Sequence, residues 1–430
     1  MVRLEDNKFY TENKAIEVLP LPRKVYIPLS QHLGQPCKPI VEIGDIVALG
    51  QKIGSIDAHL YAPVHASISG KVVSIEDYPH PILGKSKTIV IERDGSSASP
   101  NYKIRPQDEV DKLTSQEIRN IIFESGIVGM GGASFPTHIK LNPPKSVDTL
   151  IINGAECEPY LTADYRLMIE KTDEIVKGVE LVARCLGVKK VYIAIEDNKP
   201  EAIKRFEIRN SCLTGRQAKF EIKILKSAYP QGGEKQLIKS VLGKEVPRGK
   251  LPFDAGVMVH NIGTVFAIYE AVYLSKPLYE RVVTVTGRCL ENPKNLLVRI
   301  GTPIKELIDF CGPLKEDPAK IIIGGPMMGI AQYTDQVPVI KSTNGVLLFD
   351  KKEAKNLDEE YCIRCGACVR ECPAGLMPCL INLASEKALW QDAINYGALD
   401  CMECGICNYV CPANRILVQS IKRAKLEAVR

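Results

Sequence analysis

The sequence predicts a multidomain α/β protein that also carries β modules, and three observations indicate this class. A chain of 430 residues is longer than one hydrophobic core usually organises. Residues 112–275 alternate apolar, strand-like runs with amphipathic, helix-like runs, as expected of an α/β layer. A cysteine pattern of one spacing occurs twice after residue 360. With 45% apolar and 25% charged residues, the composition is typical of a soluble globular protein.

Several classes of protein are disfavoured. The net charge of +5 is mild, and no basic, aromatic-rich array indicates a nucleic-acid partner. The opening "MVRLEDNKFY" is charged, unlike a secretory signal. The most apolar long stretch, "GVMVHNIGTVFAIYEAVYL", contains His260, Asn261 and Glu270 and is unlike a membrane span. We therefore expect no nucleic-acid partner, no transmembrane segment of its own and, at any membrane, a peripheral role.

Residues 1–105 are predicted to form an all-β unit. Between residues 23 and 93, short strand-like runs are separated by glycine turns. The pair "VEIGDIVALGQKIG" and "APVHASISGKVVSI" resembles the barrel-sandwich hybrid of biotinyl and lipoyl carriers. Such carriers present a modifiable lysine on the hairpin between the two halves, but residues 54–61 contain none. A scaffold or docking module is therefore the better interpretation.

Residues 106–278 are predicted to form an α/β unit with a largely parallel sheet. "TLIINGA" and "KVYIAIE" are typical of buried strands, and "YRLMIEKTDEIVKGVELVARCLG" has helical spacing. Residues 279–350 return to strands with one helix and predict a small β-rich unit. The charged stretch "FDKKEAKNLDEE" then indicates a linker.

Residues 351–430 carry the repeated cysteine pattern. "CIRCGACVRECP" (362–373) and "CMECGICNYVCP" (401–412) share the spacing C-x2-C-x2-C-x3-C-P. Three thiolates on one tight loop suit three corners of a [4Fe–4S] cluster, and in two-cluster ferredoxins the fourth cysteine ligates the other cluster. We assign one cluster to Cys362, Cys365, Cys368 and Cys411, and the other to Cys401, Cys404, Cys407 and Cys372.

Structural zinc is the alternative for these arrays, but its sites use paired C-x2-C units and have little use for four cysteines in one short loop. The segment between the arrays has helical character, so helical and β-rich ferredoxin types both remain open. The basic end "RILVQSIKRAKLEAVR" predicts a terminal helix, either amphipathic and docking or simply solvated. We expect the other cysteines to be buried structural thiols in a reducing compartment: Cys37, Cys157, Cys185, Cys212, Cys289, Cys311 and Cys379.

Four further motifs are candidates for a binding site. In "GMGGASFPTHIK" (129–140), glycines allow backbone N–H groups to surround an anion, and a lysine adds charge. "INGAECEPYLTADYR" (152–166) follows a predicted strand, where a crevice would lie in an open α/β sheet. "YPQGGEKQLIKSVLG" (229–243) is a second glycine-rich turn before a helix, and "VHNIGTVFAI" (259–268) adds hydrogen-bonding side chains.

These four motifs, in this order, resemble those of the flavin- and NADH-binding subunit of respiratory complex I. The whole chain resembles the RnfC family, the C subunits of the Rnf complexes, which are membrane-bound ferredoxin:NAD oxidoreductases. The resemblance extends from "LPLPRKVYIPLSQHLGQP" to both cysteine arrays. It implies an N-terminal barrel-sandwich hybrid, a complex I flavin-subunit-like α/β domain, a soluble-ligand-binding β-grasp unit and a two-cluster ferredoxin domain. It also implies FMN, NAD(H) and two [4Fe–4S] clusters as cofactors.

The resemblance implies roles for individual residues. The glycine-rich loop and its lysine are expected to bind the FMN phosphate. Phe135 and Glu234 are our candidates for positioning the nicotinamide at the catalytic site. The cofactor-binding set is Gly129, Gly131, Gly132, Lys140, Asn153, Glu156, Glu158, Tyr229, Gly232, Gly233, Glu234, His260, Asn261 and Thr264. Ala155, Gly233 and His260 stand where the complex I motifs have aspartate, glutamate and asparagine. In the simplest alternative, the three glutamates of this set are ordinary solvated acids.

The function implied is that of a peripheral oxidoreductase subunit of an ion-translocating complex, on the cytoplasmic side of the inner (plasma) membrane. FMN would exchange a hydride with NAD and pass single electrons to the clusters, with the other Rnf subunits and, through them, ferredoxin as partners. A cobalamin reductase of a bacterial microcompartment is a second enzyme hypothesis. A non-catalytic ferredoxin scaffold, which would purify without flavin absorbance, is the non-enzyme hypothesis.

Overall fold

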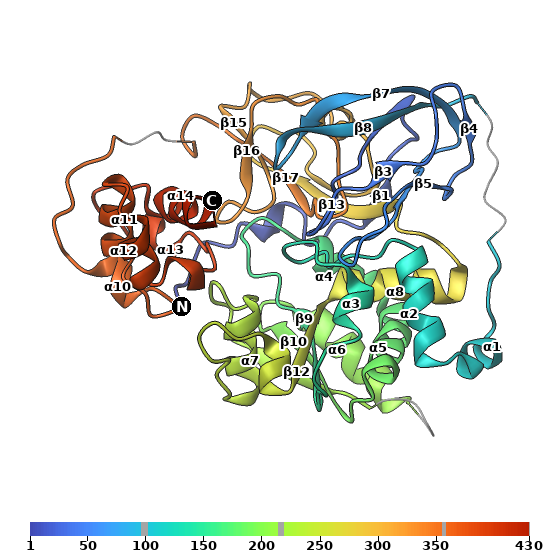
Figure 1. Cartoon of the computed structure of the whole chain (residues 1–430), viewed down its shortest axis with the longest axis horizontal. Helices are drawn as coiled ribbons and strands as arrows, with labels where there is room; N and C mark the ends of the chain where they lie inside the picture. Colours follow the sequence, from blue (N-terminus) through green and yellow to red (C-terminus); the bar gives the residue numbers. More distant parts are fainter. Residues whose placement is uncertain (96–101, 214–218, 355–357, 430) are drawn as a thin grey trace.

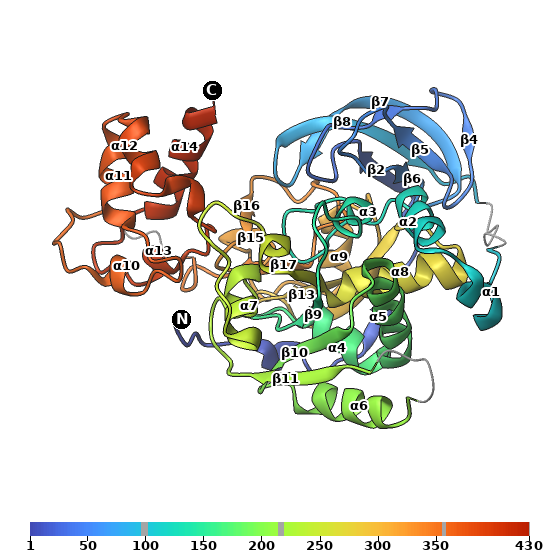
Figure 2. The same ribbon diagram turned by 60° about the horizontal axis from the view of Figure 1, so that its bottom comes forward.

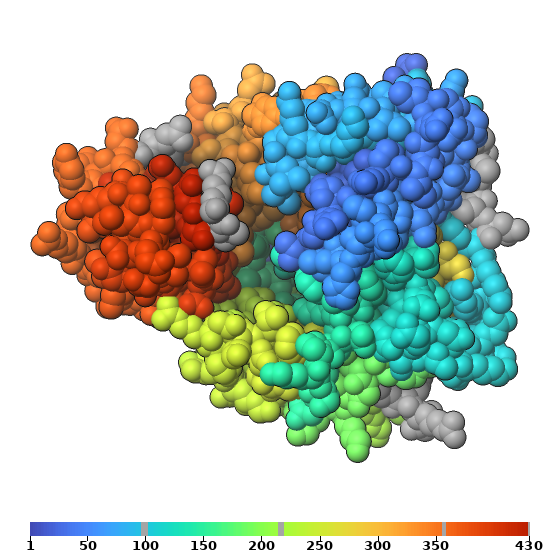
Figure 3. Space-filling view, viewed as in Figure 1, coloured from blue at the N-terminus to red at the C-terminus, as the bar shows by residue number. Residues whose placement is uncertain are grey.

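The computed structural model describes residues 1–95, 102–213, 219–354 and 358–429. Four units follow one another along the chain, and Figure 1 shows the fourth (red) at one end of the molecule, with the first (blue) and the second (green) on opposite sides of the rest. In the space-filling view the surface is hollowed where the fourth unit meets the second (Figure 3).

The first unit is built mainly from strands, as predicted, and a short 3-10 helix, η1 (Lys8–Tyr10), precedes them. Its two sheets have the orders β2-β8-β7-β4 and β3-β5-β6, and Val25, Ile53 and Ile89 are among the fully buried side chains between them. The long hairpin of β7 and β8 is antiparallel. The strands are β2 (Lys24–Pro28), β3 (Lys38–Pro39), β4 (Ile46–Val47), β5 (Lys52–Ser55), β6 (Val64–His65), β7 (Gly70–His80) and β8 (Gly84–Glu92).

The second unit contains a four-stranded sheet of order β11-β10-β9-β12, and each neighbouring pair is parallel. Its strands are β9 (Thr149–Gly154), β10 (Lys190–Glu196), β11 (Glu221–Leu225) and β12 (Val257–Asn261). Successive strands run outward from β9 to β11, and the chain then returns to the other side of β9 as β12. In such a sheet, ligands bind at the carboxyl ends of the strands where the order reverses, here between β9 and β12.

Helices cover both faces of this sheet, which explains the continuous apolar run of β9. Leu150 and Ile152 point into the core shared with α2, α5 and α8, whereas Ile151 packs with α7 residues on the other face. Figure 2 shows α6 lying along β11. The helices are α1 (Gln107–Lys112), α2 (Ser115–Glu124), α3 (Thr137–Lys140), α4 (Ala163–Glu170), α5 (Thr172–Leu186), α6 (Pro200–Ser211), α7 (Glu234–Leu242), η2 (Pro252–Ala255) and α8 (Ile262–Leu274).

The stretch with helical spacing at 165–187 forms two helices rather than one. The break falls at Lys171, whose φ of −132° and ψ of 32° are not helical. Thr172 donates its hydroxyl to the carbonyl oxygen of Met168 at 2.6 Å. Such a side-chain bond competes with the backbone pattern of a helix, which accounts for the interruption.

The third unit is a six-stranded mixed sheet of order β1-β14-β13-β17-β15-β16 with one helix. Its members are β1 (Ile16–Val18), β13 (Glu280–Thr286), β14 (Lys294–Arg299), α9 (Ile304–Phe310), β15 (Lys320–Ile323), β16 (Ile330–Gln332) and β17 (Gly345–Phe349). The edge strand β1 pairs in parallel with β14, with Ile16 opposite Asn295. β1 comes from the range 1–105, which was predicted to form the first unit, yet it lies in the sheet of the third unit.

The fourth unit is helical in the part that the structure describes, and no strand occurs within 358–429. This favours the helical ferredoxin type that the sequence left open. Its elements are α10 (Ala367–Arg370), α11 (Pro378–Glu386), α12 (Trp390–Asn395), η3 (Ala398–Asp400), α13 (Ile406–Tyr409) and α14 (Leu417–Val429). The terminal helix α14 packs on α11 and α12 through Ile421 and Ala424, so it is part of the core of this unit. Of the predicted linker, residues 355–357 lie outside the described residues.

No helix within the described ranges is both long and apolar enough to cross a membrane.

The expectation of buried single cysteines holds for four of the seven. Cys37, Cys185, Cys289 and Cys311 are buried, Cys157 and Cys379 are half-buried, and Cys212 is exposed. Cys212 is the C-cap residue of α6.

Candidate functional site

A cavity of about 390 Å³ lies at the carboxyl ends of β9 and β12, where the strand order reverses. Its size and position are those of ligand sites in open α/β sheets. All of the residues that the motifs predicted for cofactor and nicotinamide binding line it: Gly129, Gly131, Gly132, Phe135, Lys140, Asn153, Glu156, Glu158, Tyr229, Gly232, Gly233, Glu234, His260, Asn261 and Thr264. We call this space the flavin cavity, after the motifs that surround it.

The glycine-rich loop before α3 forms an open wall of the flavin cavity. Gly129 donates its N–H to the carbonyl of Phe135 at 2.9 Å, and Met130 donates to the hydroxyl of Thr264 at 2.9 Å, so the loop is fixed at both sides. A Cβ atom added at Gly132 would meet no described atom within 4 Å. A Cβ atom at Gly131 would instead come within 2.9 Å of Asn261. The open face at Gly132 is the cradle that an anionic group could enter.

Two lining side chains offer polar atoms without a protein partner in the described structure. They are His260 Nε2 and Thr137 Oγ1, both buried. Burial, helped by the nearby Lys140 ammonium, lowers the pKa of His260 well below its ordinary value, so the imidazole is neutral. A buried polar atom without a partner is costly, and a bound ligand with matching groups would remove that cost.

Lys140 and Glu234 face each other across the flavin cavity. The Nζ of Lys140 lies 2.7 Å from Oε1 of Glu234, and both side chains are partly exposed. The predicted phosphate-binding lysine and the predicted nicotinamide-positioning glutamate thus form an ion pair. Because exposed pairs of this kind contribute little to stability, a charged ligand can separate them at small cost.

The two asparagines of the motifs hold the walls of the cavity together. Asn153 donates to the carbonyl of Gly232 at 2.9 Å. Asn261 caps α8 by accepting from the N–H of Gly263 at 2.8 Å and donates to Asp164 at 2.6 Å. Burial and the neighbouring Glu156 carboxylate raise the pKa of Asp164 to about 7.

Glu156 and Glu158 bind backbone N–H groups rather than facing solvent. Glu156 accepts from the N–H of Asp164 at 2.7 Å, at the start of α4, where a carboxylate is favoured by the helix dipole. Glu158 accepts from the N–H groups of Met327 and Met328 at 3.1 and 3.0 Å. Burial raises the pKa of Glu158. The alternative that these two are ordinary solvated acids is therefore wrong, while Glu234 remains partly exposed.

Four cysteines surround a second, small cavity in the fourth unit. Cys372 of the first array lines it together with Cys401, Cys404 and Cys407 of the second. This is the set that we assigned to one cluster. The described residues contain no group of three His, Cys, Asp or Glu side chains suited to a single metal ion. Each thiolate of a [4Fe–4S] cluster binds a different iron atom, so its ligands stand farther apart than those of one ion.

The other four predicted ligands lie nearer the surface. Cys362 and Cys365 are exposed, and Cys368 is buried. Burial, with Cys379 and Cys411 as its neighbours, raises the pKa of the Cys368 thiol to about 11. Cys411 thus lies within electrostatic range of Cys368, and its place in the outer ligand set stays a prediction. The sequence analysis did not place Cys379 beside this ligand set, because a single cysteine outside the two arrays shows no metal-ligand spacing.

Comparisons with known proteins agree with this arrangement. Family profiles match in the order RnfC barrel sandwich hybrid domain at residues 2–96, Nuo51 FMN-binding domain at 122–270, SLBB domain at 282–331 and 4Fe-4S dicluster domain at 354–412. The C subunit of the proton-translocating ferredoxin:NAD(+) oxidoreductase complex of Clostridium ljungdahlii is 49% identical over 99% of this chain and 93% of its own length. The chain belongs to the RnfC family.

Other relatives and a solved structure extend the comparison. The C subunit of the Na(+)-translocating ferredoxin:NAD(+) oxidoreductase complex of Acetobacterium woodii is 45% identical, covering 95% of this chain and 91% of the relative. The C subunit of the ion-translocating oxidoreductase complex of Rhodobacter capsulatus is 44% identical, covering 98% and 81%. The fold resembles that of an NAD+-reducing [NiFe]-hydrogenase, with a TM-score of 0.51 and 17% identity over 76% of this chain and 64% of that one. The predicted family, fold class and oxidoreductase subunit are confirmed.

In this RnfC chain, three lining residues of the flavin cavity escaped the motif analysis because they come from other units. Met328 and Asn344 belong to the third unit and Met402 to the fourth. Met402 also lines the cysteine cavity. No local pattern marks them, since their place depends on how the units pack.

Like Met402, Tyr229 connects the flavin cavity with the second cysteine array of this RnfC chain. Its hydroxyl donates to the carbonyl of Cys404 at 2.8 Å and lies 3.3 Å from Glu158. Burial and the Glu158 carboxylate raise the pKa of Tyr229, so the phenol stays protonated. Tyr229 packs with Cys404 and Ile406 in one small apolar cluster.

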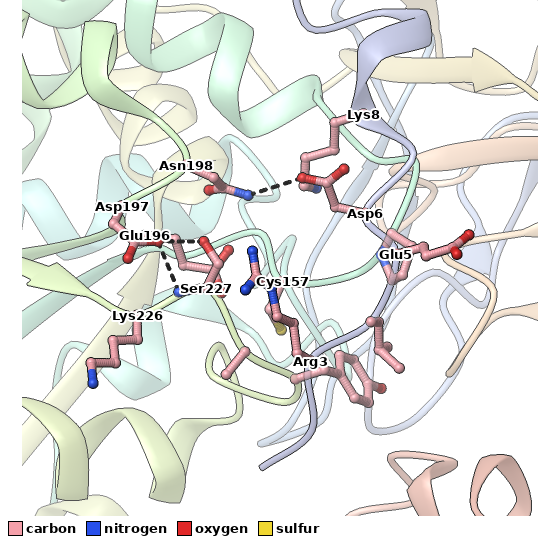
Figure 4. A pocket seen from close by; sticks show the side chains of 14 residues that line it. Arg3, Glu5, Asp6, Lys8, Cys157, Glu196, Asp197, Asn198, Lys226 and Ser227 are labelled. Carbon is pink, nitrogen blue, oxygen red and sulfur yellow. Dashed lines mark hydrogen bonds between the residues drawn. The ribbon is translucent and has the colours of Figure 1, made fainter.

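A larger, open cavity of about 830 Å³ adjoins the flavin cavity and shares Cys157 and Tyr229 with it. It lies at the carboxyl ends of β10 and β11, and the first residues of the chain form one wall (Figure 4). Glu196 is buried at its base and pairs with Lys199 at 3.1 Å. The sequence motifs did not predict this cavity.

Proposed function

We propose that this chain is a peripheral electron-transfer subunit of an Rnf-type complex, which moves electrons between ferredoxin and NAD through FMN and two [4Fe–4S] clusters. The observation that carries the proposal is the shared position of Met402. This side chain lines both the flavin cavity and the cavity of four cysteines. Two redox sites that share a wall are suited to pass electrons directly.

The residues fit FMN in the flavin cavity. The loop at Gly132 is open to an anionic phosphate, and Lys140, which lines the same cavity, adds positive charge. The unpartnered atoms of Thr137 and His260 can pair with polar groups of the ligand. Bound there, FMN would exchange a hydride with NAD and single electrons with the clusters. Phe135 and Glu234, which line the same cavity, are proposed to position the nicotinamide.

The eight array cysteines fit two clusters with crossed ligation. Cys372, Cys401, Cys404 and Cys407 are proposed to hold the cluster nearer the flavin cavity, since Met402 and Tyr229 lie between the two spaces. Cys362, Cys365, Cys368 and Cys411 are proposed to hold the outer one. Two of these outer cysteines are exposed, and their neighbours Tyr361 and Ile363 are 93% and 68% exposed. The proposed partner, another member of the complex, would contact this outer loop on the cytoplasmic side of the membrane.

The decisive experiment combines cofactor content with one glycine variant. Anaerobically purified protein should contain FMN and iron. Gly132→Val places a side chain in the open cradle, and flavin occupancy should fall about tenfold, which needs only about 1.4 kcal/mol of lost binding free energy. Iron content should stay at the wild-type value. Flavin retention by this variant would mean that the cradle lies elsewhere, and wild-type protein without flavin would refute the proposal.

Two matched variants sharpen this experiment. Gly131→Val is expected to act differently, because its side chain would displace Asn261 and disturb the start of α8 as well as the ligand. Glu234→Gln should keep flavin and raise the KM for NADH in the reduction of an artificial acceptor. Loss of flavin from Glu234→Gln would contradict the nicotinamide role of this residue.

A further inference from the structure

The first residues of the chain form an arm, residues 2–12, that lies against the loop 155–162 of the flavin cavity. Val2 and Tyr229 exchange two backbone hydrogen bonds of 3.0 and 2.8 Å. Tyr160 donates its N–H to the carbonyl of Asp6 at 2.7 Å. Figure 4 shows this arm passing the large cavity, with Asp6 and Asn198 joined by a hydrogen bond of 3.5 Å. The arm thus touches the loop, Tyr229 and the end of β10.

Lys8 is the centre of this contact. Its ammonium donates to the carbonyl oxygens of Glu156, Glu158 and Leu161 at 3.0, 2.9 and 2.6 Å. The side chain is buried, with 3% of the residue exposed. All three partners belong to one turn of the loop 155–162, so the loop wraps around the ammonium. An ammonium has three donors, and these bonds use all of them.

The loop has a backbone that needs such support. Glu156 and Tyr160 both adopt left-handed conformations, with φ of 47° and 69°. Residues with side chains disfavour this region, and it persists only where surrounding contacts impose it. Three carbonyl groups that converge on one point also repel one another unless a cation lies between them. Lys8 supplies that cation.

The loop in turn fixes the cavity wall. Glu156 caps α4, and Glu158 reaches Met327, Met328 and Tyr229. The same loop contributes Glu156, Cys157, Glu158 and Leu161 to the lining of the flavin cavity. A change in the backbone of this loop therefore alters the cavity wall and the contact with the third unit. It also alters the position of Tyr229, which donates to the carbonyl of Cys404.

We propose that Lys8 is a positioning residue of the flavin cavity: its ammonium sets the conformation of the loop 155–162 and thereby the affinity and the redox potential of the bound flavin. This inference rests on the proposed function, since it assumes that FMN occupies the cavity. It extends the site to an arm that lies outside the flavin-binding motifs.

Lys8→Met tests the inference, because methionine keeps most of the side-chain length and removes the ammonium. We expect the dissociation constant for FMN, measured by titrating flavin-free protein, to rise about tenfold or more, as for the loss of hydrogen bonds to a charged group. We also expect the flavin midpoint potential to shift. Lys14→Met is the control, since Lys14 lies just beyond the arm but donates to the carbonyl of Pro293, and neither residue lines the cavity.

The outcomes separate this inference from the proposed function. If wild type binds FMN and Lys8→Met binds it with equal affinity and potential, the positioning role is wrong while the flavin site stands. If wild type binds no FMN, the proposed function fails first. A variant that only lowers the thermal unfolding temperature, as a merely structural lysine would, also contradicts the inference. Should Lys8→Met not accumulate, Lys8→Gln, which keeps N–H donors without the charge, is expected to bind FMN more weakly than wild type, and equal affinity would contradict the role.

Discussion

At the level of single residues, Cys372 joins the two cysteine arrays. It belongs to the first array by sequence, yet it lines the small cavity with three cysteines of the second. The N–H of Leu376 donates to its sulfur at 3.4 Å. The proposed crossed ligation would make each array depend on the other.

Cys372→Ser is expected to damage the cluster whose other ligands are Cys401, Cys404 and Cys407. Roughly half of the iron should be lost, and the EPR signal of the other cluster should persist. Cys379→Ser is the control: this cysteine lies beside Cys368 but is outside both predicted ligand sets, so both signals should remain. Loss of the cluster held by Cys362, Cys365 and Cys368 after the Cys372 change would refute crossed ligation.

The residues of the flavin cavity that the sequence predicted share one property: each lies in a short local sequence motif. Gly132 stands in a glycine-rich turn, and Asn261 directly follows an apolar strand. Met328 and Met402 could not be found this way, because they reach the cavity from units whose packing no short motif records. The internal bonds of Glu156 and Glu158 were missed for a related reason, since their backbone partners are set by the folded loop.

At the level of elements, α14 is the helix that closes the fourth unit. Ile421 and Ala424 are buried against α11 and α12, and Leu417 and Val418 pack beside Cys368 and Cys407. Lys425 of the same helix donates to the carbonyl of Cys401 at 2.6 Å. Neither of the two predicted roles, docking or free in solvent, describes this helix, because most of its apolar face is already covered by its own unit.

Ile421→Ala should destabilise the fourth unit by about 2–5 kcal/mol, as expected for a large aliphatic side chain removed from a core. Cys372 and Cys401, two of the proposed cluster ligands, pack against that core, so iron should be released at a lower denaturant concentration than in wild type. Leu426→Ala on the same helix is the matched control, because Leu426 is 69% exposed. Equal iron release in both variants would show that α14 does not support the clusters.

The elements most readily predicted were the long and buried ones. β9 and β10 have continuous apolar runs, and their parallel pairing was expected from the alternation with helices. β1 was not predicted to join the third unit, because a strand of three residues carries little pattern and its partner β14 is far along the chain. The break at Lys171 was missed because the apolar spacing continues across it.

At the level of the whole molecule, one buried lysine connects the first three units. Lys341 of the third unit donates to the carbonyl oxygens of Pro63 in the first and Gly126 in the second, at 2.7 and 2.8 Å. Only 1% of the residue is exposed. Burial lowers the pKa of Lys341 from 10.5 to about 8. Folding therefore makes Lys341 lose its proton at a lower pH than it would in the unfolded chain, and the neutral amine can still donate to both carbonyl groups.

This lysine should make stability depend on pH in a definite direction. Between pH 8 and 10.5 the unfolded chain holds the proton that the folded protein has released, so the contribution of Lys341 to stability rises with pH. The full rise is about 3 kcal/mol. Other groups titrate in the same range, so the measurement is the difference between wild type and Lys341→Met in the free energy of unfolding by urea, at pH 7.5 and at 9.5. A difference that is constant with pH would contradict the lowered pKa.

The pairing of β1 with β14 has a consequence for how the chain is made. Residues 16–18 leave the ribosome early, but their partners, residues 295–297, emerge only after most of the chain. At a synthesis rate of roughly 5–20 residues per second, the early segment waits for tens of seconds. During that interval the arm that carries Lys8 cannot be anchored through β1, and Met328 and Asn344, which line the flavin cavity, have not yet been made. Cofactor loading is therefore expected to follow translation rather than to accompany it.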